Sequence, residues 1–145
     1  MELVVKRFDE LFIDELYEIL KVRSEVFVVE QNCVYQDMDD KDKYSYHIYL
    51  KEDGKIKAYL RLIDKGKSFE EVSIGRVLTL DRGKGYANVI LEEAIKIAKE
   101  KMNADKIKIE AQTYAKKMYE KFGFKQVSDE FLEDGIEHIQ MLLEL

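Results

Sequence analysis

Two glycines alternate with two basic residues in the middle of the chain, at Arg82-Gly83-Lys84-Gly85. A strand-like apolar run over residues 72–80 precedes them, and a helical pattern begins at Tyr86. Glycine lets the backbone curve around an anion, and the first turn of a helix adds unpaired N–H donors. The segment therefore predicts a phosphate or pyrophosphate site. From these residues alone, a plain strand-to-helix turn with a solvated basic pair is an equal alternative.

The segment matches neither of two common glycine-rich phosphate motifs. Lys84 is followed by Gly85 rather than by Ser or Thr, so the segment is not a Walker loop. Asn88 stands where a dinucleotide fingerprint has its third glycine, and the segment does not follow the first strand. The ligand must therefore be sought among other phosphate-bearing molecules.

Alternating helices and strands must position this segment. Apolar spacing predicts helices over residues 13 to about 30, 86–101 and 115–122, and the β-branched pair Val28-Val29 favours a break in the first. Strands are predicted over residues 3–8, 46–50, 55–63, 72–80, 106–111, 124–127 and 137–143. Asp53-Gly54 and Asp134-Gly135 predict tight hairpin turns, and Gly75 inside a strand predicts a bulge or a close backbone approach. The order of elements predicts a mixed α/β (α+β) sheet with helices on its faces.

Composition excludes several classes of function. At about 150 residues per domain, residues 1–145 predict a single domain. No apolar run approaches the roughly 18 residues that span a bilayer, and the first residues lack a signal-peptide pattern. The 24 basic and 30 acidic residues argue against nucleic acid as a partner. One cysteine and two histidines do not make the usual zinc sites, and no metal is expected. We expect a cytoplasmic monomer or homodimer without a membrane partner.

Two blocks resemble motifs of the GCN5-related N-acetyltransferase superfamily. Arg82-x-x-Gly85-x-Ala87 is similar to the coenzyme A pyrophosphate motif, which begins with Gln or Arg and ends with Gly or Ala. The second block is Gln112-x-x-Ala115-x-x-x-Tyr119-x-x-x-Gly123-Phe124. It is similar to a family block in which a short helix carries a tyrosine and Gly-Phe opens the next strand.

Further stretches resemble the ElaA-type subgroup of that family. They are residues 26–33, 35–37, 74–77 and 132–139. The segment between Val77 and Arg82 is about two residues shorter than usual, and Val34 stands where the subgroup often has proline. The resemblance implies a sheet of about seven strands with about four helices. It also implies that the parallel strands 72–80 and 106–111 are neighbours that diverge at their C-terminal ends.

The resemblance implies an enzyme that transfers an acetyl group from acetyl-CoA to an amine on a small molecule or a protein. A backbone N–H near Val77, Leu78 and Thr79 would polarise the thioester carbonyl, and Tyr119 would protonate the leaving thiolate. The remaining residues implied to bind the cofactor are Arg82, Gly83, Lys84, Gly85, Tyr86, Ala87, Asn88, Gln112 and Ala115. A non-catalytic acyl-CoA sensor or interaction module with the same fold is the alternative.

Several titratable side chains are candidates for the acceptor site. They are Glu25, Glu30, His47, Arg76, Glu110 and His138. Each has an ordinary structural alternative: a solvated helix or strand carboxylate, a hydrogen-bonded core histidine, or an arginine in an ion pair. The aspartates of the acidic loop 37–42 resemble a calcium loop, but the loop lacks the glycine at its sixth position.

Overall fold

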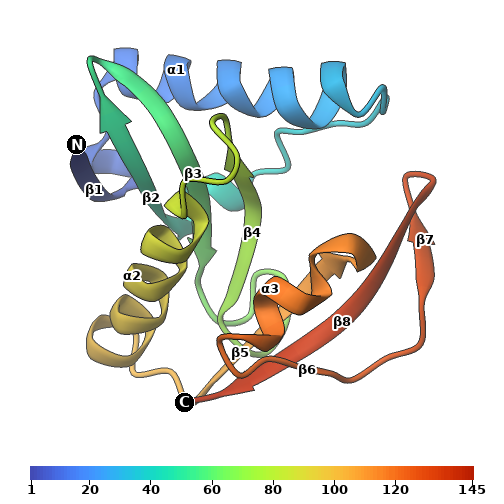
Figure 1. Cartoon of the computed structure of the whole chain (residues 1–145). Helices are drawn as coiled ribbons and strands as arrows, with labels where there is room; N and C mark the ends of the chain where they lie inside the picture. Colours follow the sequence, from blue (N-terminus) through green and yellow to red (C-terminus); the bar gives the residue numbers. More distant parts are fainter.

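The computed structural model describes all 145 residues, which form two antiparallel sheets (Figure 1). The first sheet has the order β1 (Glu2–Arg7), β2 (Ser45–Glu52), β3 (Lys55–Ile63) and β4 (Ser73–Thr79). In the second, β8 (Ile136–Glu144) lies between β5 (Lys106–Gln112) and β6 (Lys125–Gln126), and also pairs with β7 (Phe131–Glu133). The helices are α1 (Ile13–Arg23), α2 (Tyr86–Lys101) and α3 (Lys116–Glu120). None of them is both long and apolar enough to span a bilayer.

A single parallel contact joins the two sheets. Val72 bridges to Ile107, and the Lys108 N–H donates to the Val72 carbonyl over 2.9 Å. Beyond this point β4 pairs only with β3, and β5 pairs only with β8. The prediction of neighbouring parallel strands that diverge is confirmed. The expected single sheet of about seven strands and about four helices differs in detail, because eight strands separate into two sheets with three α-helices.

Alternation along the strands gives the first sheet two buried faces. On one face Ile48, Leu60 and Leu62 join the α2 side chains in the larger core. On the other face Tyr49 and Tyr59 pack with α1 in a smaller core. Successive strand residues point to opposite faces, so the same strands support helices on both sides. The central stripe of α2 recurs at helical spacing, as its sequence predicts.

A bulge interrupts β4 shortly after it leaves β5. Tyr59 pairs with Leu78 and Arg61 with Gly75, so Leu60 alone faces the two residues Arg76 and Val77. The bulge predicted at Gly75 is confirmed, and the left-handed residue is its neighbour Arg76, with φ of 52°. A bulge bends the strand and increases its twist, which favours the divergence of β4 from β5.

The other local predictions hold with small changes. Instead of breaking, α1 continues into the π-helical segment Ser24–Glu30. Both hairpin turns are confirmed, because each Asp-Gly pair adopts positive φ at both residues. Short 3-10 turns occur at Phe8–Glu10, Lys41–Tyr44 and Thr113–Ala115. The last of these leads into α3, and Gly123, with φ of 97°, ends the helical stretch as predicted.

Candidate functional site

A cleft of about 900 Å³ occupies the space between the diverging sheets. Arg82 and Ala87 line it where α2 begins, and Glu133 and His138 line it at the β7–β8 hairpin. We call these the α2 end and the hairpin end. Between them the cleft is lined by β4, β5, the end of the π-helical segment and α3. It therefore joins the predicted phosphate site to several of the titratable candidates.

The α2 end has the geometry of an anion cradle. Gly83 and Gly85 adopt φ of 82° and 75°, and no atom lies within 4 Å of a Cβ built on either. Gly85 is the N-cap of α2, and no side chain caps the helix there. The first-turn N–H groups of a 16-residue helix are thus available to an anion, with the positive end of the helix dipole behind them. Of this turn, Arg82 and Ala87 line the cleft, whereas the other residues of the turn do not: Gly83, Lys84, Gly85, Tyr86 and Asn88.

The middle of the cleft presents a free strand edge. Val77, Leu78 and Thr79 line it, and β4 uses only its opposite edge to pair with β3. Unpaired backbone groups on a strand edge can receive an extended ligand as an additional strand.

Tyr119 lines the cleft and also belongs to the larger core. The residue is 7% exposed, and its ring packs edge-on against Phe124, with ring centroids 5.6 Å apart. Burial raises the pKa of Tyr119, so its hydroxyl stays protonated through the neutral range, and no hydrogen bond within the protein occupies it. A neutral, unpaired hydroxyl in a cleft can give a proton to a bound group. Ala115 lines the same region.

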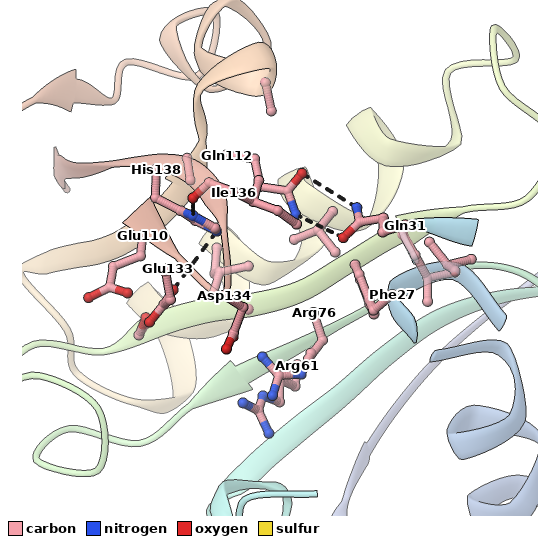
Figure 2. A pocket seen from close by; sticks show the side chains of 18 of the residues that line it. Phe27, Gln31, Arg61, Arg76, Glu110, Gln112, Glu133, Asp134, Ile136 and His138 are labelled. Carbon is pink, nitrogen blue, oxygen red and sulfur yellow. Dashed lines mark hydrogen bonds and ion pairs between the residues drawn. The ribbon is translucent and has the colours of Figure 1, made fainter. Parts of the chain in front are cut away.

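An amide bridge crosses the cleft at the end of β5. The Gln112 and Gln31 side chains exchange two hydrogen bonds of 3.4 Å each, as Figure 2 shows. Gln112 is thus joined to the end of the π-helical segment. Gln31 is not among the site residues predicted from the sequence, although it lies inside the stretch that resembles the ElaA-type subgroup.

Three arginines and three aspartates form a compact cluster under the loop that follows the π-helical segment. We call it the arginine–aspartate cluster: Arg23, Arg61, Arg76, Asp37, Asp39 and Asp42. Burial opposes ionisation of Asp39, yet its pKa is lowered because Arg61 donates to it and Arg76 attracts it. Arg76, a candidate for substrate binding, lines the cleft but donates to Asp37 over 2.9 Å.

Two acceptor candidates do not reach the cleft. His47 is fully buried beneath the cluster, where its Nδ1 lies 2.7 Å from the Tyr59 hydroxyl and its Nε2 lies 2.9 Å from the Asp42 carbonyl. Burial lowers the pKa of His47, and both of its ring nitrogens have internal partners, so the geometry favours the hydrogen-bonded core histidine over the substrate-binding alternative. Glu25 is exposed on the π-helical segment and does not line the cleft, whereas Glu30 does.

Acidic side chains gather at the hairpin end. Ile109 and Ala111 point into the core, so Glu110 points to the opposite face, toward Glu133 on β7 (Figure 2). Burial, and then the Glu110 carboxylate, raise the pKa of Glu133. Glu133 Oε2 lies 3.8 Å from His138 Nε2. Sequence reasoning missed Glu133 because only the fold of the hairpin brings it beside Glu110.

The comparisons with known proteins agree with this architecture. A family profile described as an acetyltransferase (GNAT) domain matches residues 13–145. The chain belongs to the GNAT acyltransferase family. A UPF0039 protein of Schizosaccharomyces pombe is 40% identical over all of this chain and 98% of its own length.

Solved GNAT relatives match the whole fold. The Escherichia coli ElaA structure has a TM-score of 0.90 and 32% identity, and the alignment covers 99% of both chains. An acyl-CoA N-acyltransferase from Pseudomonas aeruginosa gives the same TM-score at 34% identity, also with 99% of both chains covered. The resemblance to the superfamily and to its ElaA-type subgroup is confirmed. GNAT proteins use acyl-CoA, and the open turn at the α2 end has the donors that a pyrophosphate requires.

Proposed function

We propose that this GNAT protein transfers an acetyl group from acetyl-CoA to an amine on a small molecule or a protein, by direct attack of the amine on the thioester. The observation that carries the proposal is the continuous cleft, which joins Arg82 and Ala87 at the start of α2 to Tyr119 and to the hairpin end. Residues 1–145 act as one acyltransferase domain, in the cytoplasm, as a monomer or homodimer.

The cradle and the free edge of β4 hold the cofactor in this proposal. N–H groups from Gly83 to Asn88 receive the pyrophosphate, assisted by Arg82 and Lys84. The free edge from Val77 to Thr79 pairs with the pantetheine arm, and a backbone N–H there polarises the thioester carbonyl. Gln112 and Ala115 complete the wall of this part of the cleft.

Tyr119 protonates the leaving sulfur. In the reaction a C–N bond forms and the C–S bond breaks, and the amine nitrogen gives up two protons overall. One proton is released to solvent. The other replaces the proton that Tyr119 gives to the thiolate, so the tyrosine ends the cycle neutral. The unpaired hydroxyl in a mostly buried position supports this role over a purely structural one.

Two measurements test the proposal. Isothermal titration with acetyl-CoA should show saturable binding, and a panel of amines with acetyl-CoA should release free thiol in proportion to the acetylated amine. Absence of acetyl-CoA binding would refute the cofactor assignment. Binding without turnover of any amine would favour a non-catalytic acyl-CoA sensor with the same fold.

A further inference from the structure

Most positive charge beside the hairpin end is already neutralised inside the protein. Arg61 makes two hydrogen bonds of 2.7 Å to Asp39 and one of 3.0 Å to Asp42. Arg76 is held by Asp37, which also accepts from Arg23. The arginine–aspartate cluster holds three cations and three anions, so it offers no free cation to a carboxylate on a substrate.

The negative charge at the hairpin end is not neutralised in the same way. Glu110, Glu133 and Asp134 line the cleft, and none forms a salt bridge with a lysine or arginine. Glu30 lines the same cleft, and Lys41, which lines it beside the arginine–aspartate cluster, is the one lysine among the lining residues. The hairpin end therefore carries an excess of carboxylates that face an open volume.

An unpartnered histidine nitrogen supplies a second, independent observation. His138 is 9% exposed, and its Nδ1 donates to the Ile136 carbonyl over 2.7 Å. Its Nε2 lies 3.8 Å from Glu133 Oε2, which is beyond hydrogen-bonding distance. The Nε2 of His138, which lines the cleft, is therefore available to a group that enters it. Figure 2 shows His138, Glu110 and Glu133 together on one wall of the cleft.

We infer that Glu110, Glu133 and His138 bind the ammonium of the acceptor, and that the acceptor is a primary aliphatic amine that carries no free carboxylate. The inference rests on the proposed acetyl transfer and names its substrate class. An ammonium between the two glutamates relieves their mutual repulsion. The ammonium transfers one proton to His138 Nε2, which passes it to solvent, and the neutral amine then attacks the thioester. A carboxylate on the acceptor would meet like charge at the hairpin end, where the two nearby lining arginines, Arg61 and Arg76, are already paired with aspartates.

Pairs of acceptors that differ only by a carboxylate test whether the site rejects a negatively charged acceptor. Cadaverine and lysine differ by one carboxylate, as do 1,4-diaminobutane and ornithine. Each diamine should have a kcat/KM at least about tenfold above that of its amino acid, a ratio that corresponds to about 1.4 kcal/mol. Nα-acetyl-lysine methylamide, which has no carboxylate, separates the two sources of such an amine. Its preference over the diamines would indicate a lysine side chain in a peptide, and the reverse would indicate a free diamine.

Variants separate binding from folding. Glu110→Gln and Glu133→Gln should raise the KM for the diamine about tenfold and leave the KM for acetyl-CoA unchanged. Because each removes a like-charge contact, neither should lower the Tm at neutral pH, whereas a merely structural role would lower it. Glu137→Gln removes the same charge from an exposed position next to His138 and should change neither constant.

The outcomes distinguish this inference from the proposed function. If lysine and ornithine are acetylated as well as the diamines, or if both glutamine variants keep the KM of the diamine, the acceptor assignment is wrong and acetyl transfer stands. If acetyl-CoA binds and no amine in the panel is acetylated, both fail.

Discussion

Tyr119 combines two properties at the residue scale that a proton donor needs. Its ring packs edge-on against Phe124 in the core, and Tyr119 lines the cleft with no internal hydrogen bond to its hydroxyl. Tyr119→Phe keeps the ring and removes the transferable proton. We expect turnover to fall by roughly 10²–10⁴-fold at saturating acetyl-CoA, with the affinity for acetyl-CoA unchanged. Steady-state kinetics and titration measure the two quantities, and unchanged turnover would transfer the role of acid to water or His138.

The pH profile gives Tyr119 a second test. An ordinary tyrosine has a pKa of about 10, and burial raises the pKa of this one. The protonated form is the active acid, so a tyrosine-dependent loss of activity is expected only on the alkaline side and above about pH 10. A profile of kcat measured to the highest pH at which the fold persists checks this. An alkaline limb near pH 8 that disappears in Tyr119→Phe would contradict the assignment.

At the scale of the secondary-structure element, we expect the turn before α2 to determine cofactor binding. Gly85 has φ of 75°, and no atom stands near its missing Cβ. A side chain there would be strained by about 1–2 kcal/mol and would occupy the open face of the cradle. Gly85→Val should therefore abolish acetyl-CoA binding in titration, with only a modest loss of stability.

Gly54 provides the matched control for that substitution. It also has φ of 75° with nothing near its Cβ, but it lies in the β2–β3 hairpin and not in the turn before α2. Gly54→Val should cost similar stability and keep full acetyl-CoA affinity. Equal losses of affinity in both variants would show that strain, rather than the cradle, explains the effect.

Helices and turns that depend mainly on residues close together in the sequence could be predicted from it. The stripe of α2 gives residues 86–101 without error, and the two Asp-Gly turns locate their hairpins. The π-helical segment was missed because its wide turns follow from tertiary packing, which apolar spacing does not encode. The division into two sheets was also missed, since it depends on how few backbone bonds β4 and β5 share.

Contacts between distant residues explain what sequence reasoning could not assign in the site. Gln31 and Gln112 are 81 residues apart, and Arg76 and Asp37 are 39 apart. Charge alone could not show that Arg76 is neutralised internally while Glu110 and Glu133 are not. Such pairing depends on the folded chain. The sequence therefore predicted which residues bind the cofactor, but it did not decide among the candidates for the acceptor site.

At the scale of the whole molecule, the arginine–aspartate cluster fastens the loop beside the cleft to both β3 and β4. Asp42 accepts from Arg23 over 2.7 Å and from Arg61 over 3.0 Å. Asp42→Asn removes the negative charge that neutralises part of the positive charge of two buried guanidinium groups. We expect a loss of about 3–5 kcal/mol in the free energy of unfolding, measured by chemical denaturation. Asp40→Asn is the control, since Asp40 is exposed and pairs with Lys43 over 3.4 Å, so its loss should be within about 1 kcal/mol.

Low pH should break the ion pairs of the arginine–aspartate cluster. The pKa of Asp42 and that of Asp39 are lowered in the folded protein against the opposing effect of burial, because arginines hold both carboxylates ionised. A lowered pKa contributes stability that is present above the unfolded pKa of about 3.9 and is lost as pH falls toward the folded value. The Tm of the wild type should therefore fall steeply below about pH 4. In Asp42→Asn the Tm starts lower and should fall less over the same interval. Parallel curves for the two proteins would place the acid-sensitive carboxylates outside the cluster.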